Sequence, residues 1–168
     1  MDDRPEETTR RVADAMIRGF LWLAHHLLLG WWFLWRPRHD SAVVAVWLEE
    51  RILMIRHSYR AALNWPGGGI EGGEHPAEAA ARELREELGL DAAPGALALI
   101  GEVENRWEYR VDRLWIFELR LQKEPHVTLD RREVVAASFM APSEAIVRPL
   151  PPYIRDYFRE RGFVVHGL

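Results

Sequence analysis

A run of one proline and three glycines, Trp65-Pro66-Gly67-Gly68-Gly69, constrains the fold more than any other segment of the chain. Proline lacks an amide donor and glycine loses the most entropy in a regular element, so we predict a loop here. A helix is predicted to follow over Pro76–Leu88. Pro76 suits its first turn, Glu78 can bond back to the helix start, and Gly89 suits a left-handed stop. The chain must therefore pass from a glycine loop directly into a helix.

The two faces of this predicted helix differ in chemistry. One face has small or apolar side chains three and four residues apart, which can lie closely on a sheet: Ala77, Ala80, Ala81, Leu84 and Leu88. The other face carries Glu83, Glu86 and Glu87 within one turn. Three such carboxylates repel one another unless a cation lies among them, and Mg²⁺ prefers oxygen ligands. A solvated acidic face is the alternative, and in both cases we expect Glu86 and Glu87 to be exposed.

Alternating or β-rich segments on both sides of this helix predict strands. A hairpin is expected from two segments separated by Glu49-Glu50, namely Ser41–Leu48 and Arg51–Ser58. Three further strands are expected at Leu97–Arg106, Arg110–Leu121 and Val134–Met140, and Pro142 and Pro151 each precede a short helical pattern. This order favours an α+β arrangement or an α/β/α sandwich around a mixed sheet.

The amino-terminal residues contain the most apolar segment of the chain. Gly19–Trp35 reads GFLWLAHHLLLGWWFLW and is interrupted only by His25 and His26. A membrane span needs about 20 apolar residues, so this segment is at the short limit. The acidic start MDDRPEE and the lack of a small-residue cleavage site argue against a secretory signal. We therefore predict a hydrophobic helical extension over residues 1–40 and a globular domain over residues 41–168.

Helical spacing places Asp14, Arg18 and His25 on a narrow polar stripe of this otherwise apolar helix, which we expect to be buried on most sides. Three arrangements are open: packing on the domain or on a second copy of the chain, lying in a membrane interface with tryptophan anchors, or spanning the bilayer. Adjacent helical residues point about 100° apart, so His25 and His26 cannot easily share an ion. We assign this histidine pair no chemistry.

Composition restricts the class of function. The 168 residues include 22 basic and 26 acidic side chains, which gives a net charge of −4 and a sequence pI near 6.0. Nucleic-acid binders usually carry a surplus of basic residues, so we expect no nucleic-acid partner. The chain contains no cysteine, which excludes disulfides, a thiolate nucleophile and a cysteine zinc site, and favours a cytoplasmic location.

The glycine run and the helix together resemble the Nudix box. Gly68, five residues, Glu74, seven residues and Arg82-Glu83-Leu84-x-Glu86-Glu87-x-Gly89-Leu90 match every fixed position of this 23-residue motif, Gly68–Leu90. The chain is identified as a member of the Nudix hydrolase family, without a subfamily. The resemblance implies an α/β/α sandwich around a mixed sheet. It also implies hydrolysis, dependent on Mg²⁺ or Mn²⁺, of a nucleoside diphosphate linked to another group.

By this resemblance, the metal ligands are expected to be Glu83, Glu86, Glu87 and the carbonyl of Gly67. Arg82 resembles the arginine that pairs with the acidic residues of the box and fixes their orientation. It is therefore counted with the catalytic residues although it should not touch the substrate.

The resemblance also leaves two candidates for the catalytic base. Family members carry the base on the box helix or on a later loop, so Glu83 and Glu133 compete for this role, and Glu133 is also a candidate metal ligand. The expected catalytic residues are then Arg82, Glu83, Glu86 and Glu133. Substrate contacts are expected from Gly68, Gly69, Glu74, Arg60 and Tyr59. His57, Tyr59 and Arg60 either reach a phosphate group or lie in an exposed loop.

Three functions remain open from the sequence. The leading one is a cytoplasmic or membrane-peripheral pyrophosphohydrolase acting on a small nucleoside diphosphate derivative. The second is a membrane-associated hydrolase of a lipid-linked or prenyl diphosphate, brought to the bilayer by the amino-terminal helix, which could instead form a homodimer. The third is a non-catalytic module that senses a nucleotide. The complete set of Glu83, Glu86 and Glu87 argues against this third function, because a binder has little use for three clustered carboxylates.

Overall fold

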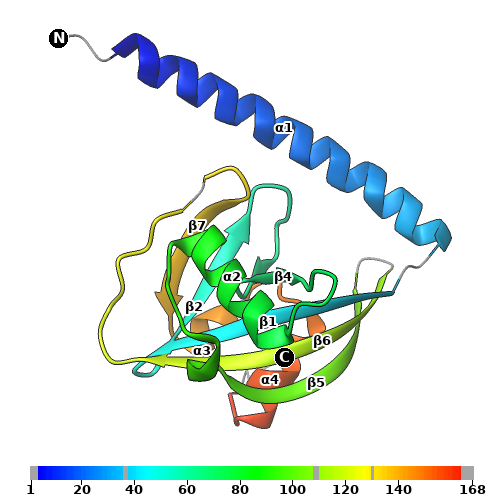
Figure 1. Cartoon of the computed structure of the whole chain (residues 1–168), viewed down its shortest axis with the longest axis vertical. Coiled ribbons are helices and arrows are strands. Elements are labelled where there is room, and N and C mark those ends of the chain that lie inside the picture. The colour runs from blue at the N-terminus through cyan, green and yellow to red at the C-terminus, as the bar shows by residue number, and fades with distance from the viewer. Residues whose placement is uncertain (1–3, 36–37, 108–109, 130, 164–168) are drawn as a thin grey trace.

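A computed structural model describes residues 4–35, 38–107, 110–129 and 131–163. Its centre is a seven-stranded mixed sheet in which β1 and β6 run parallel and the other paired strands run antiparallel (Figure 1). The main strand order is β3 (Leu63–Asn64), β2 (Arg51–His57), β1 (Arg38–Leu48), β6 (Arg110–Leu121) and β5 (Ala98–Trp107). Two strands lie off this path: β4 (Gly67–Gly69) pairs with β1, and β7 (Val134–Met140) pairs with β2.

Helices cover both faces of the sheet, which confirms the α/β/α sandwich (Figure 1). One core cluster lies between the sheet and α2 (Pro76–Leu88), and the other lies between the sheet and α3 (Pro142–Ala145) and α4 (Pro152–Glu160). Strand β1 supplies both clusters, because successive side chains of a strand point to opposite faces. Ala42, Val44 and Val46 face α2, and Val43, Ala45 and Trp47 face α4.

The predicted bounds of the central helix are confirmed. His75 accepts a hydrogen bond from the Ala77 amide at 3.3 Å, and the Glu78 carboxylate accepts one from the His75 amide at 3.0 Å. This capping box satisfies amides that have no partner within the helix. Gly89 ends the helix with a left-handed φ of 66°. The predicted hairpin and later strands are also present, and a short 3-10 helix, η1 (Pro94–Ala96), precedes β5.

The prediction that Gly67–Gly69 lie in a loop is wrong, because these residues form strand β4. They pair antiparallel with Ser41, Ala42 and Val43 of β1. Backbone pairing needs no side chain, and the missing Cβ atoms are what permit the approach: a Cβ on Gly67 would collide with the Ala42 carbonyl. The glycines therefore allow this segment to pair closely with the sheet, and they do not make it a loop.

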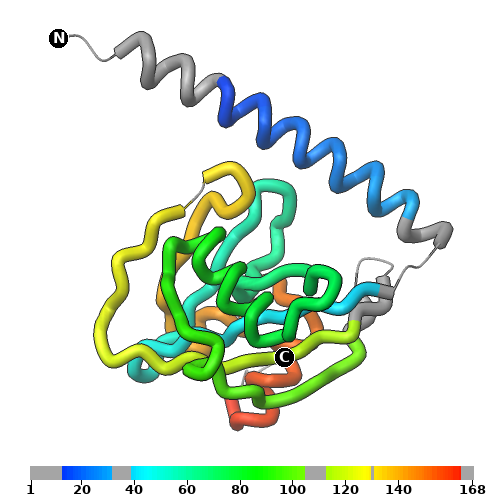
Figure 2. The backbone as a smooth tube through the Cα atoms, in the orientation of Figure 1, coloured from blue at the N-terminus to red at the C-terminus, as the bar shows by residue number. Residues whose placement is uncertain are grey.

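The predicted amino-terminal helix is present: α1 spans Arg4–Trp35, within the predicted extension of residues 1–40, and strand β1 already begins at Arg38. Helix α1 lies outside the layered domain, on the side of the segments that follow β2 and precede β7, which contribute Tyr59 and Arg132 to the contacts with α1 (Figure 2). Its polar stripe faces the domain, where Asp14 lies 3.8 Å from Arg132. Met16, Phe20 and Leu27 point away and are 68–72% exposed, so the single chain covers α1 on one side and not on most sides as expected. Among the described residues, no helix has the length and apolarity of a membrane span.

Candidate active site

A pocket of about 500 Å³ lies between α1, α2 and the strands β1 and β4. This volume is typical of sites for small organic ligands. The pocket brings together most of the residues predicted from the sequence, from four separate segments: Tyr59, Arg60, Gly67, Gly68, Gly69, Glu83, Glu86, Glu87 and Glu133. Arg82 and Glu74 lie behind this lining and not within it.

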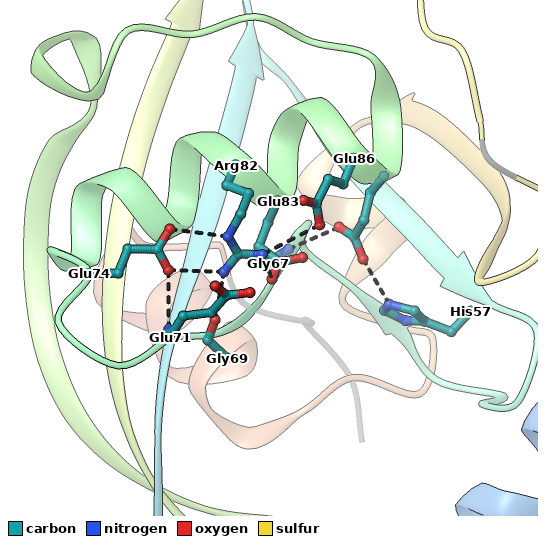
Figure 3. A network of polar contacts seen from close by, with 9 residues as sticks. His57, Gly67, Gly69, Glu71, Glu74, Arg82, Glu83 and Glu86 are labelled. Carbon is teal, nitrogen blue, oxygen red and sulfur yellow. Dashed lines mark hydrogen bonds and ion pairs between the residues drawn. The ribbon is translucent and has the colours of Figure 1, made fainter.

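Arg82 connects the glycine strand to the acidic face of α2 (Figure 3). Its Nε donates to Glu74 at 3.1 Å and its Nη2 donates to the Gly69 carbonyl at 2.9 Å. Its Nη1 lies 2.8 Å from a Glu83 oxygen and 3.4 Å from a Glu86 oxygen. The hydrogen bond to Arg82 holds the pKa of Glu74 below its usual value. The guanidinium of Arg82 thus fixes the orientation of the Glu83 and Glu86 carboxylates, and it also pairs with Glu74.

Glu87 is buried, which contradicts the expectation that it is exposed like its neighbour. Glu87 is 5% exposed as a whole residue, whereas the side chain of Glu86 is 59% exposed. One Glu87 oxygen accepts the Gly67 amide at 3.0 Å, and the other lies 3.2 Å from Nε2 of His57. Buried carboxylates require such partners. Glu87 therefore connects α2 to the glycine strand and to the end of β2.

Glu83 lies against the backbone of the glycine strand. A Cβ added to Gly68 would collide with the Glu83 carboxylate, so a larger residue would displace this carboxylate from its place beside β4. Burial, with added repulsion from Glu87 and Glu86, outweighs the hydrogen bond from Arg82 and raises the pKa of Glu83 to about 7. In this environment, the Glu83 carboxylate is stabilised either by binding a proton or by a nearby cation.

The residues of this site fit a divalent cation by donor chemistry. Three carboxylates from one helix turn line the same pocket, and oxygen donors of this kind suit Mg²⁺ and Mn²⁺. In the part of the chain that the structure describes, no three acidic or histidine side chains are already gathered as they would be around an ion. Arg82 Nη1 contacts both Glu83 and Glu86, and it supplies the positive charge between them.

Glu133 and Tyr59 form the side of the pocket provided by the loops around β2 and β7. The Tyr59 hydroxyl donates to the Glu133 carboxylate at 2.7 Å, and the Ser58 amide donates to the Glu133 carbonyl at 2.8 Å. Burial and the charge of Glu133 raise the pKa of Tyr59, so the phenol stays protonated and keeps donating. The guanidinium of Arg60 lies 5.5 Å from the centre of the Tyr59 ring.

Two histidines line this pocket: the sequence left the place of His57 open between a phosphate contact and an exposed loop, and it assigned His25 no role. His57 is the last residue of β2 and is 4% exposed, not part of an exposed loop. The period of two along β2 could have found it, because Leu53, Ile55 and His57 share the face that α2 covers. His25 of α1, to which we assigned no chemistry, is 8% exposed and lines the pocket. The position of His25 on the polar stripe of α1 could have indicated that its side chain faces the domain.

Comparisons with known proteins agree with this geometry. A family model described as "NUDIX domain" matches residues 37–160. An RNA pyrophosphohydrolase from Halorhodospira halophila is 41% identical over 79 residues, which cover 47% of this chain and 42% of that protein. The match thus spans less than half the length of this curated relative.

Two solved structures share the fold. A MutT protein from Methanosarcina mazei is 26% identical, with a TM-score of 0.62 over 74% of this chain and 93% of that one. A bifunctional NMN adenylyltransferase/ADP ribose pyrophosphatase from Francisella tularensis, described as complexed with AMP and a manganese ion, is 17% identical. Its TM-score is 0.64 over 84% of this chain and 48% of that one. With the family model covering most of its length and the box carboxylates lining one pocket, this chain belongs to the Nudix family.

Proposed function

We propose that this chain hydrolyses a phosphoanhydride bond of a nucleoside diphosphate derivative with the help of Mg²⁺ or Mn²⁺. The observation that carries this proposal is the convergence of Glu83, Glu86 and Glu87 with the glycine strand on one pocket of about 500 Å³. Clustered carboxylates beside exposed backbone suit a cation-bound phosphate group, because the cation offsets the charges of both.

The metal would be held by Glu83, Glu86 and Glu87, with the Gly67 carbonyl as a further ligand. When bound, such an ion neutralises phosphate charge and lowers the pKa of a water molecule. Arg82 keeps Glu83 and Glu86 in place through its Nη1, and His57 keeps Glu87 in place through its Nε2. These two residues act on the ligands and not on the substrate.

Two carboxylates remain candidates for the base that accepts the proton of the attacking water. Glu83 has a pKa raised to about 7, which suits proton transfer near neutral pH. Glu133 lies in the same pocket and is oriented by the Tyr59 hydroxyl.

Substrate contacts in this proposal come from Gly68, Gly69, Tyr59 and Arg60, which line the pocket, whereas Glu74 acts through Arg82. The relative from Halorhodospira halophila is named an RNA pyrophosphohydrolase, so the 5′ triphosphate end of RNA joins the small nucleotides as a candidate substrate. The net charge of −4 still favours small nucleotides, and a cytoplasmic location remains a prediction.

The test is a panel of substrates incubated with the full chain and Mg²⁺: nucleoside triphosphates, nucleotide sugars, dinucleoside polyphosphates, triphosphorylated RNA and prenyl diphosphates. We expect at least one nucleotide of the panel to be cleaved into two phosphate-bearing products, which chromatography separates, and we expect EDTA and Glu86→Gln to abolish this cleavage. Hydrolysis that persists in EDTA would refute metal dependence. Nucleotide binding without hydrolysis of any panel member would favour the non-catalytic module.

A second candidate is a membrane-associated hydrolase of a prenyl or lipid-linked diphosphate. The outward face of α1 favours it, since Met16, Phe20, Leu27 and Trp31 are exposed on the helix whose inner face lines the pocket. Under this candidate, phosphatidylcholine vesicles would raise the rate on prenyl diphosphates above the rate on nucleotides. Equal rates with and without vesicles would exclude it.

A further inference from the structure

Helix α1 contributes one wall of the active-site pocket although it lies outside the segment matched by the Nudix family model. That segment begins at residue 37, whereas four side chains of α1 line the pocket that holds the box carboxylates: Leu21, Ala24, His25 and Leu28. These positions recur at offsets of three and four, so they form one face of the helix. Residues of the Nudix box and a wall from outside the matched segment therefore meet in one cavity.

His25 is held firmly in this wall. It is one of three polar residues found buried in the described part of the chain, and the other two, His57 and Glu87, lie in the same pocket. Its ring centre lies 4.9 Å from that of Tyr59. Tyr59 is in turn fixed by its 2.7 Å hydrogen bond to Glu133. A side chain positioned in this way needs little reorganisation to contact a ligand.

The chemistry of the wall indicates which part of a substrate it contacts. Leu21, Ala24 and Leu28 offer no hydrogen bonds, and the imidazole of His25 adds a flat ring with a polar edge. A sugar would leave its hydroxyl groups without partners on the apolar side chains of this wall. A planar heteroaromatic ring can lie flat against both the imidazole ring and the apolar side chains.

We propose that His25 is a specificity-determining residue, which contacts the heteroaromatic base of a nucleotide whose phosphate groups lie at Glu83, Glu86 and Glu87. This inference rests on the proposed function for the place of the phosphate groups. Leu21 and Leu28 flank His25 and complete the base-binding wall. The substrate is then selected by a helix that the family motif does not include.

The chain contains a matched control for this proposal. His26 is adjacent and chemically identical to His25, but it is exposed and bonds to the Trp22 carbonyl of its own helix at 2.7 Å. We compare His25→Ala with His26→Ala on the nucleotide that the panel identifies. Tripolyphosphate, which has phosphates and no base, serves as a competitive inhibitor.

His25→Ala should raise KM for the nucleotide about tenfold while kcat changes less than about twofold, because the lost contact is to the base and not to the reacting atoms. The inhibition constant of tripolyphosphate should stay unchanged, His26→Ala should behave as wild type, and His25→Phe should recover part of the loss. Equal KM values for the two alanine variants would overturn the proposal. An equal loss of tripolyphosphate binding would also overturn it, because a purely structural role would weaken both ligands.

A binding measurement separates this inference from the proposed function. Calorimetry with a non-hydrolysable α,β-methylene nucleotide and Mg²⁺ reports base recognition without turnover. If no panel member is hydrolysed but His25→Ala weakens this binding about tenfold, the hydrolase proposal fails and the assignment of His25 stands. If wild type hydrolyses nucleotides and both alanine variants bind the analogue equally, the assignment fails and the hydrolase proposal stands.

Discussion

Glu86 and Glu87 are neighbours in the chain, yet they lie in different environments. The Glu86 side chain is 59% exposed and contacts Arg82, whereas Glu87 is buried between His57 and the Gly67 amide. The sequence predicted that both residues belong to the site, but it did not predict this difference. Burial of Glu87 depends on the end of β2 and on the glycine strand, which are distant from it in the sequence. Helical spacing alone cannot report such contacts.

This difference predicts unequal effects on stability. Glu87→Gln should lower the free energy of unfolding by about 1–2 kcal/mol. The substitution removes the charge of a buried carboxylate and so weakens its hydrogen bonds to both of its partners. Glu86→Gln should change it by less than about 0.5 kcal/mol, because an exposed side chain loses only a weak ion pair. Urea unfolding of both variants in EDTA measures the two values. Equal destabilisation would contradict the environments described for these residues.

Glu83 should make the metal-free protein less stable at neutral pH than at acidic pH. The folded protein binds the Glu83 proton with a pKa of about 7, whereas the ordinary value is 4.5, so the folded state holds this proton more tightly. The free energy of unfolding should therefore fall as pH rises from about 4.5 through about 7, by on the order of 1–3 kcal/mol.

Unfolding in EDTA at several pH values tests this prediction, with Glu83→Gln as the control that lacks the titrating group. The wild type should lose more stability than the variant between pH 5 and about 7.5. Mg²⁺ at the higher pH should restore wild type and leave the variant unchanged. Parallel curves for the two proteins would show that Glu83 titrates normally.

Among the elements, the bounds of α2 and most strands were predicted from the sequence, because these depend on local periodicity and caps. The same patterns left an α+β arrangement and an α/β/α sandwich open, and the resemblance to the Nudix family implied the sandwich. Prediction from the sequence failed at β4, where composition indicated a loop. Glycine is unfavourable in strands on average, but here the absence of side chains is what allows the Gly67 backbone to reach β1 and the Glu83 carboxylate to lie on Gly68. These contacts lie between elements, so no local pattern contains them.

Adjacent glycines in β4 offer a direct test of this arrangement. Gly68→Ala places a methyl group where the Glu83 carboxylate lies, and it should cost about 1–3 kcal/mol of stability as the two groups move apart. A Cβ on Gly69 meets no atom within 4 Å, so Gly69→Ala should keep the free energy of unfolding within about 0.5 kcal/mol of wild type. Thermal and urea unfolding compare the two, and equal stability would refute the close approach at Gly68.

At the scale of the whole molecule, α1 was predicted as a helix, but its relation to the domain was not. Periodicity identified the polar stripe of Asp14 and His25, which in the structure faces Arg132 and Tyr59. The sequence left open whether α1 packs on the domain or a second copy, lies in a membrane interface or spans the bilayer, because this depends on residues more than a hundred positions away, such as Arg132. The outward face leaves large apolar side chains uncovered in the single chain.

We expect the outward face of α1 to bind phosphatidylcholine vesicles. Phe20→Ser combined with Leu27→Ser should reduce co-flotation with vesicles about tenfold, because two exposed apolar side chains are removed from one helix face. Val147→Ser is the matched control, since Val147 is 66% exposed but lies elsewhere on the domain. If wild type does not float and light scattering instead gives twice the 19.6 kDa mass, a homodimer covers this face and the membrane prediction is wrong.

Under the proposed function, the carboxylates of α2 support metal-dependent hydrolysis in this pocket. The most direct test is kcat/KM with Mg²⁺ for wild type, Glu86→Gln and Glu78→Gln, on the best nucleotide of the panel. Glu78 lies on the same helix and caps its start, a role that glutamine retains, so it controls for the loss of one charge. Glu86→Gln should lower kcat/KM roughly a hundredfold, because it removes a ligand of the ion, and Glu78→Gln should leave it unchanged. Full activity in Glu86→Gln would contradict the account.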